Sequence, residues 1–347
     1  MSKPLLLFDP YFRSRAELFS DATFAALGDL CRIEAAADGP MDPAVIDAAL
    51  PQAAFYVGAR PALTRAQIEG ASHLRAVIEV SGAFHAELDY SACFDAGVEV
   101  LSCAPGFRRA VAEMGLAMIL AAGRGLVAEH EAFRAGREAW LDDRPATDFS
   151  LFGQRVGFVG YGNIARELHR LLAPFAPDVS FYDPWVAEAG DAARHDDMGA
   201  VFAQSRVVVV TAAPTSQNRH GIGAEQIARM PPGAALVLLS RAHVLDFDAA
   251  LAAARAGRIT FATDVFPSEP VAKDHPLRRQ PGVVLSPHRA AAVPGGRHPI
   301  GDMILHDIGA LLSGAGTRLL QPADPARLTA LIAAQQSIEA DGRLPAT

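Results

Sequence analysis

The sequence contains four side chains suited to acid–base chemistry, each just after, or a few residues beyond, a short apolar run typical of a buried strand. They are Arg241, Asp264, Glu269 and His288. An arginine binds a carboxylate through a planar, permanently charged fork, and a histidine exchanges protons near neutral pH. Ligands of open α/β sheets bind beyond the carboxyl ends of the strands, so we expect these groups to face one crevice. Each residue alone is equally well explained as a surface or packed side chain. The convergence of all four predicts a catalytic site.

Two series of short apolar runs, alternating with helical patterns, supply the strands that would position these residues. The first series predicts strands at residues 5–9, 53–57, 76–80 and 98–101, and helices at 15–27, 43–49 and 64–70. The second series predicts strands at residues 155–159, 179–182, 206–210, 235–239, 259–263 and 283–285. Such alternation builds parallel sheets with helices on both faces. Between the two series, residues 110–125 are mostly apolar all round, which predicts a buried helix.

The order of these elements predicts an α/β protein with two doubly wound parallel-sheet domains, Rossmann-like or flavodoxin-like, and an active-site cleft between them. A chain of 347 residues is long enough for two such domains. A helix at about 298–312 is expected to fold back onto the first series, followed by a tail of Pro, Ala and mixed charge. We therefore predict a discontinuous substrate domain, residues 1–102 and 292–347, and an inserted nucleotide-binding domain, residues 103–291.

A dinucleotide fingerprint, Gly160-x-Gly162-x-x-Ala165, follows the predicted strand at 155–159 and opens a helix of apolar period. In a Rossmann unit the first glycine allows a tight turn, the second lets the backbone approach a pyrophosphate, and a small third residue lets helix and strand pack. The pyrophosphate then lies at the helix N-terminus. The predicted phosphate-binding positions are Gly160, Gly162, Asn163 and Ile164.

Asp183 ends the strand after the fingerprint, where an acidic side chain accepts hydrogen bonds from the ribose hydroxyls of adenosine. Its carboxylate would repel the extra phosphate of NADP, and no arginine follows it directly. The prediction is therefore a site for NAD rather than NADP. The less specific alternative is an ordinary βαβ crossover with a surface aspartate.

The composition argues against several other classes of protein. Lys and Arg number 31 against 39 Asp and Glu, a formal net charge of −8, which disfavours a general nucleic-acid binder. The apolar run at residues 5–8 is too short for the core of a signal peptide, and no run reaches the length of a membrane span. The three cysteines have no paired or metal-binding spacing. We therefore expect a reduced, cytoplasmic protein without a metal site.

Several separate motifs, in a fixed order, give the chain a specific resemblance to a known family. They are Val111-Ala-Glu113, the fingerprint at 157–165, Arg229-Met-Pro-Pro-Gly-Ala before a strand that runs into Leu-Ser-Arg241, Asp264-Val-Phe-Pro-Ser-Glu269-Pro, and Leu285-Ser-Pro-His288. Together they resemble the D-2-hydroxyacid dehydrogenase family from about residue 74 to about residue 292. The resemblance implies an enzyme that transfers hydride between NAD and a D-2-hydroxy acid or its 2-oxo acid.

The resemblance also implies a role for each predicted catalytic residue. Arg241 would bind the substrate carboxylate and polarise the 2-oxo group. His288 would exchange a proton with the carbonyl oxygen, while Glu269 hydrogen-bonds the other ring nitrogen and fixes its tautomer. Asp264 would hold the nicotinamide carboxamide. The backbone lining the cofactor would belong to Ala212, Ala213 and Pro214.

In the first domain, the resemblance implies that backbone amides of the loop 81–85 meet the substrate carboxylate. The predicted contacts there are Gly82, Ala83 and Phe84. The loop carries Phe84-His85 where the family commonly has an acidic residue, so the change falls on the substrate pocket.

The substrate stays open between two interpretations of the neighbouring residues. Phe84 and Phe107 favour an apolar or bulky substrate. Arg60, Arg108 or Arg109 would instead suit a second anionic group.

Two alternatives to a 2-hydroxyacid dehydrogenase also stay open. One is an NAD(H)-sensing, corepressor-like binding protein on the same scaffold, and the other is a dehydrogenase of phosphite or another non-carbon donor. The expected partner is a small 2-hydroxy or 2-oxo acid, with neither nucleic acid nor membrane. The resemblance further implies a homodimer built through the helix at 110–125 and its neighbours.

Overall fold

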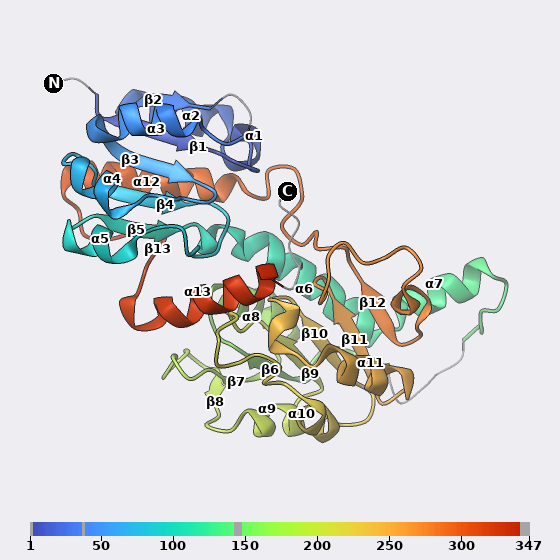
Figure 1. The fold of residues 1–347 in the computed structure, drawn as a ribbon. Helices are drawn as coiled ribbons and strands as arrows, with labels where there is room; N and C mark the ends of the chain where they lie inside the picture. Colours follow the sequence, from blue (N-terminus) through green and yellow to red (C-terminus); the bar gives the residue numbers. More distant parts are fainter. Residues whose placement is uncertain (1–2, 37–38, 142–147, 341–347) are drawn as a thin grey trace. The chain divides into compact units, whose positions relative to one another are not determined.

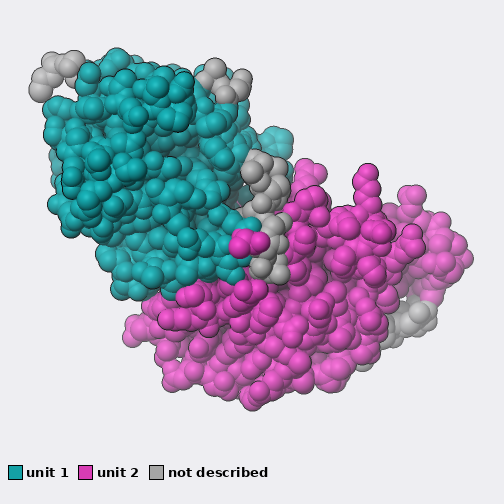
Figure 2. All heavy atoms as spheres, viewed as in Figure 1, with its two compact units in different colours: residues 1–108, 291–339, 346–347 teal, residues 109–290, 340–345 magenta. Residues whose placement is uncertain are grey.

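The computed structural model describes residues 3–36, 39–141 and 148–340. The described chain forms two compact units: the first contains the residues up to Arg108 together with Ala291–Glu339, and the second contains Arg109–Ala290 (Figure 2). The boundaries between the two units along the chain therefore fall at 108/109 and 290/291. The predicted domain boundaries are 102/103 and 291/292. Residues 341–347 of the predicted substrate domain lie outside the described residues.

The first unit is built on a six-stranded sheet with the strand order β13-β5-β4-β3-β1-β2 (Figure 1). Its strands are β1 (Leu5–Asp9), β2 (Arg32–Ala35), β3 (Ala53–Gly58), β4 (Ala76–Glu79), β5 (Glu99–Ser102) and β13 (Gln321–Pro322). Neighbouring strands are parallel except for β13, which pairs antiparallel with β5. The order 2-1-3-4-5 of the first five strands is flavodoxin-like, which confirms that prediction.

Helices cover both faces of this sheet. They are α1 (Arg15–Leu18), α2 (Asp21–Leu30), α3 (Pro43–Ala49), α4 (Arg65–Gly70), α5 (Tyr90–Asp95), α12 (His298–Ser313) and α13 (Pro325–Ala340), with short 3₁₀ turns at Leu50–Gln52 and Ala104–Phe107. Alternate residues of β1 point to opposite faces. Leu6 and Phe8 share a core with α2 and α12, whereas Leu5 and Leu7 share a second core with α4, α5 and α13.

The single helix expected at 15–27 is instead two helices. Ser14 begins α1 in a capping box with Glu17, and the Ser20 side chain accepts the backbone N–H of Thr23 at the start of α2. A serine that caps a new helix has extended backbone angles, so the first helix ends before it. The apolar period of the sequence continues across this break and does not reveal it.

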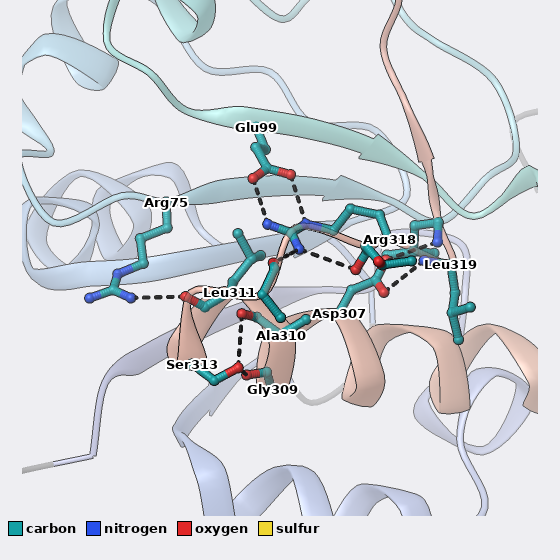
Figure 3. A network of polar contacts seen from close by, with 12 residues as sticks. Arg75, Glu99, Asp307, Gly309, Ala310, Leu311, Ser313, Arg318 and Leu319 are labelled. Carbon is teal, nitrogen blue, oxygen red and sulfur yellow. Dashed lines mark hydrogen bonds and ion pairs between the residues drawn. The ribbon is translucent and has the colours of Figure 1, made fainter.

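The segment after α12, predicted only as a tail of Pro, Ala and mixed charge, contains both β13 and α13. Its first part is fixed by a polar network (Figure 3). Arg318 donates to both carboxylate oxygens of Glu99, at 2.8 and 2.7 Å. The fully buried carboxylate of Asp307 accepts the backbone N–H groups of Leu319 and Leu320, each at 2.8 Å. These contacts join residues far apart in sequence, which a local pattern does not show.

The second unit is built on a seven-stranded parallel sheet with the order β12-β11-β10-β9-β6-β7-β8 (Figure 1). Its strands are β6 (Arg155–Val159), β7 (Asp178–Tyr182), β8 (Ala193–Arg194), β9 (Val207–Val210), β10 (Ala234–Leu238), β11 (Ile259–Thr263) and β12 (Val283–Leu285). This is the Rossmann order, whose direction reverses between β6 and β9. The predicted fold class, with a doubly wound parallel sheet in each domain, is confirmed.

The helices of this unit are α6 (Arg108–Gly123), α7 (Leu126–Arg134), α8 (Asn163–Leu172), α9 (Met198–Gln204), α10 (Ala224–Arg229) and α11 (Phe247–Arg255). The helix predicted to be buried is α6, and it is buried on one face only. Gly115 on one face packs against Leu168 and Leu239, while Leu120 on another face is exposed. No single helix among the described residues is long and apolar enough to cross a membrane. Only the pair Ala104–Gly123 and Leu126–Arg134, bent by 62°, has the length and composition when taken together.

Candidate active site

The fingerprint glycines form the turn between β6 and α8. Gly160 has a φ of 85°, and a Cβ there would lie 2.4 Å from the backbone nitrogen of Ala212, so glycine is required. Gly162 is the N-cap residue of α8, provides no side-chain cap, and has open space where a Cβ would point. Asn163 and Ile164 form the first turn. The helix thus presents backbone N–H groups beside an open space, which fits a pyrophosphate.

Asp183 follows β7 directly and is 7% exposed. Its Oδ2 accepts the backbone N–H of Tyr161 at 2.7 Å, and its Oδ1 accepts that of Trp185 at 2.8 Å. The carboxylate therefore joins the fingerprint turn to the end of β7. Each oxygen keeps a second lone pair, so the group can still accept a ribose hydroxyl.

The segment Ala212–Pro214 follows β9, across the switch point from the fingerprint. Ala212 lies directly against Gly160. Asn218 holds the segment, since its Nδ2 donates to the carbonyl of Ala213 and its Oδ1 accepts the N–H of Thr215, both at 2.8 Å. The predicted lining of the cofactor by this backbone stays a prediction.

His288 and Glu269 form a hydrogen-bonded pair, with 2.6 Å between Nδ1 and Oε2. The second carboxylate oxygen of Glu269 accepts the backbone N–H of Phe266 at 2.8 Å, which fixes the carboxylate. The His288 side chain is 36% exposed and that of Glu269 only 11%. Because Nδ1 faces the carboxylate, Nε2 is left for proton exchange with another molecule.

His288 has a φ of 52°, a left-handed conformation that is uncommon outside glycine. The backbone and side chain of Asp264 hold it there. The carbonyl of Asp264 accepts the N–H of His288 at 2.8 Å, and Oδ1 accepts the Ser286 hydroxyl at 2.5 Å. The carboxylate also accepts the N–H groups of Arg289 and Ala290, at 2.8 and 2.9 Å. The observed role of the buried Asp264 is thus to position His288, and its predicted contact with the nicotinamide stays a prediction.

Arg241 follows β10 at a partly buried position. Burial lowers the pKa of its guanidinium, and the negative charges of Glu269 and Asp264 oppose that effect. The structure therefore brings the arginine close to the acids on which the histidine depends. A guanidinium that is partly stripped of water binds an anion more strongly than an exposed one.

The loop 81–85 of the first unit follows β4 and is bound by the side chain of Glu79. Oε1 of Glu79 accepts the backbone N–H groups of Ser81 and Gly82, the latter at 2.8 Å, and Oε2 accepts the Ser102 hydroxyl at 2.9 Å. The N–H of Ala83 donates to Ser81 Oγ at 3.2 Å. The N–H groups of Gly82 and Ala83 are thus donated to acceptors within the protein. Their predicted contact with a substrate carboxylate, like that of Phe84, stays a prediction.

Glu79 is only 2% exposed, and burial raises its pKa to about 7. The hydrogen bonds from Ser81, Ser102 and Gly82 oppose this shift without cancelling it. The sequence analysis missed this residue. Its signal is a single acid within the apolar run Ala76–Val80.

Two of the side chains offered as selectors of substrate, Phe84 and Arg60, are already engaged within the first unit. Phe84 is 7% exposed and packs against Tyr90, with 6.1 Å between ring centroids, so it belongs to the core. The Nη2 of Arg60 lies 2.7 Å from Glu87 and 2.9 Å from Glu339. Two carboxylates therefore neutralise the arginine that was expected to suit a second anion. Among the described residues no group of His, Cys, Asp and Glu is arranged to hold a metal ion.

Comparison with known proteins agrees with this geometry. Residues 116–290 match the family model described as "D-isomer specific 2-hydroxyacid dehydrogenase, NAD binding domain". The chain belongs to the D-isomer specific 2-hydroxyacid dehydrogenase family. The matched region contains the fingerprint, Arg241, Glu269 and His288, and its description confirms the prediction of NAD as cofactor.

Three members of the family illustrate the range of similarity. D-3-phosphoglycerate dehydrogenase of Methanocaldococcus jannaschii is 29% identical over 73% of this chain and 48% of its own length. Glyoxylate/hydroxypyruvate reductase B of Pectobacterium atrosepticum is 30% identical over 78% and 86%. A solved phosphoglycerate oxidoreductase of Rhizobium etli superposes with a TM-score of 0.83 at 32% identity, over 93% of this chain and 99% of that one.

The chain spans about half the length of the first curated relatives that it matches, between 48% and 56% of each. Those relatives are named as D-3-phosphoglycerate dehydrogenases, and others as glyoxylate or hydroxypyruvate reductases. None of these names supports the alternative of an NAD(H)-sensing binding protein.

Proposed function

We propose that this 2-hydroxyacid dehydrogenase family member interconverts a D-2-hydroxy acid and its 2-oxo acid with NAD(H). The observation that carries the proposal is the His288–Glu269 pair, held 2.6 Å apart and partly exposed near the buried charge of Arg241. A proton donor and a carboxylate-binding cation are what the reduction of a 2-oxo acid requires from a protein.

The residues of the second unit fit a nicotinamide dinucleotide. The N-terminus of α8 would hold the pyrophosphate, and Asp183 would hold the adenosine ribose. When bound, the reduced cofactor supplies a hydride to the carbonyl carbon of the substrate. The carboxylate of Asp183 favours NAD over NADP, because a second anion would be repelled.

The proposed catalytic residues stabilise the charge that develops on the substrate and transfer the proton. Arg241 binds the carboxylate of the 2-oxo acid and stabilises negative charge that develops on the carbonyl oxygen. His288 gives that oxygen its Nε2 proton, and takes it back in the oxidative direction. Glu269 accepts the Nδ1–H throughout, so the ring keeps its orientation. Asp264 keeps His288 in its uncommon backbone conformation.

We also propose that the enzyme is a homodimer joined through α6, α7 and the segment that follows them. Large apolar side chains are exposed there: Leu126 at 61%, Phe133 at 60% and Trp140 at 76%. Exposed apolar groups gathered on neighbouring segments mark an interaction surface. A second copy of the chain would bury them. Sedimentation at low protein concentration tests this, and a monomer would contradict it.

A cytoplasmic location is the last part of the proposal. The described cysteines Cys31, Cys93 and Cys103 are all buried free thiols, which suits a reducing compartment.

The test of the activity is consumption of NADH by the purified protein across a panel of 2-oxo acids. The panel includes glyoxylate, hydroxypyruvate, pyruvate, branched and aromatic 2-oxo acids, and phosphate-bearing ones. Turnover that is lost in Arg241→Ala, while NADH still binds, is the expected result. NADH binding without turnover of any member would contradict the proposed activity.

A further inference from the structure

The C-terminal helix α13 reaches the loop 81–85 inside the first unit. Leu328 of α13 belongs to the same hydrophobic core as Phe84, Leu88 and Tyr90, which follow directly in and after the loop. The helix is tied to the unit at its start as well, because β13 pairs with β5 just before it. The last turn of α13 is therefore held in place beside the loop.

Glu339 in that last turn contacts a guanidinium and an imidazole. Its Oε2 lies 2.9 Å from the Nη2 of Arg60, and its Oε1 lies 3.4 Å from the Nδ1 of His85. Gln335, one turn earlier, donates to the same Oε1 at 2.9 Å. The Glu339 side chain is 26% exposed, so these contacts are only partly screened by water.

His85 connects Glu339 to the loop. Its side chain is 7% exposed, and its Nε2 lies 2.9 Å from the hydroxyl of Ser81. The same hydroxyl accepts the N–H of Ala83, and the carbonyl of His85 accepts the Tyr90 hydroxyl at 2.9 Å. The imidazole thus bridges the first and last residues of the loop, with one ring nitrogen toward each side.

We propose that Glu339 is a positioning residue for the substrate-binding loop, which it holds in shape through the imidazole of His85. The inference rests on the proposed function and on the predicted contact of this loop with the 2-oxo acid. It gives the C-terminal helix a part in substrate affinity rather than in fold stability alone.

The charges around His85 are consistent with this role. Burial and the nearby Arg60 lower the pKa of His85, while the carboxylates of Glu339 and Glu87 oppose that effect. Without the charge of Glu339, the ring of His85 would lie between apolar side chains and the cation of Arg60. It would lose the attraction that turns Nδ1 toward α13 and Nε2 toward Ser81.

The experiment compares Glu339→Gln with Glu87→Gln, because both carboxylates bind Arg60 and Glu339 also contacts the ring of His85. In Glu339→Gln, the KM for the preferred 2-oxo acid rises about fivefold, because the imidazole loses the carboxylate that orients it. The kcat and the dissociation constant of NADH stay at the wild-type values. Glu87→Gln keeps the wild-type KM, since any effect through Arg60 alone would appear in both variants.

A second arm tests the route through the imidazole. In a His85→Ala background, Glu339→Gln adds no further rise in KM. NMR titration of the His85 ring shows a lower pKa in Glu339→Gln than in the wild type. An unchanged KM in Glu339→Gln, or an equal rise with and without His85, overturns the proposal.

Failure of the proposed function is distinguishable from failure of this inference. If the wild type reduces no 2-oxo acid of the panel, the function fails, and the His85 titration then decides the inference. If the His85 ring has the same pKa in the wild type and in Glu339→Gln, the inference is overturned, because Glu339 then has no effect on the ring.

Discussion

Glu269 in the second unit and Glu79 in the first are carboxylates with different hydrogen-bond partners and different exposure to solvent. Glu269 in the second unit faces a histidine at 2.6 Å and one backbone N–H, at a position that remains partly open to solvent. Glu79 in the first unit faces backbone amides and a hydroxyl, and is almost completely buried. A carboxylate paired with a base is ready to stabilise a proton transfer, whereas one enclosed by its own loop determines backbone shape.

This difference distinguishes residues proposed to carry out the reaction from residues that fix the shape of a loop. Residues that touch the reacting atoms need an exposed edge, so His288 keeps 36% of its side chain accessible. Residues that shape the substrate loop can be buried entirely, at the cost of holding an ionisable group away from water. The following substitutions test this division.

The largest effect is expected for His288→Gln. Loss of the proton donor should lower kcat by about 10²- to 10⁴-fold, the usual contribution of a general acid or base. The dissociation constant of NADH should not change, because the fingerprint and Asp183 lie on other segments. Stopped-flow reduction of the preferred 2-oxo acid, together with NADH fluorescence, measures both. A variant that keeps kcat would refute the role of His288.

Glu79→Gln should change how stability depends on pH. The pKa of Glu79 is about 7 in the folded protein against an ordinary value of 4.5, so the folded state binds a proton that the unfolded state has lost. Wild-type stability therefore falls as pH rises from about 4.5 through about 7, by about 3 kcal/mol in total. The glutamine variant lacks this loss. Urea unfolding at pH 5 and pH 8 compares the two proteins, and parallel pH curves would show that Glu79 is not protonated in the fold.

Glu269→Gln should have an intermediate effect on turnover. A hydrogen bond to a charged group contributes about 1.5–3 kcal/mol, so its weakening should lower kcat about 10- to 100-fold. The free energy of unfolding should change less than in Glu79→Gln, because the His288–Glu269 pair is partly open to solvent. Steady-state kinetics and the same urea series measure the two quantities. Equal behaviour of the two glutamine variants would remove the distinction between the units.

Local pattern was sufficient for much of the second unit. The apolar runs at 155–159, 259–263 and 283–285 are strands with those bounds, and the fingerprint turn lies directly after the first of them. The reason is that every buried parallel strand is a continuous apolar run, and polar residues at its end mark the ligand-binding edge. Family membership and NAD as cofactor were predictable for the same reason.

Long-range contacts decided the rest. The break between α1 and α2 at Ser20 does not interrupt the apolar period of the sequence. The helix α13 produces no obvious helical period either. The engagement of Arg60 by Glu339, 279 positions away, depends on side chains that only the folded chain brings together. Burial likewise made Phe84 a core residue rather than a selector of substrate.

The sequence by itself thus determined the fold class, the cofactor and the residues proposed for catalysis, because strand periodicity and motif spacing are local properties of the chain. The tertiary structure alone decided which charges are already neutralised and which carboxylate is held without a cation. Those outcomes depend on desolvation and, for Arg60, on a partner 279 residues away, and no local pattern records either.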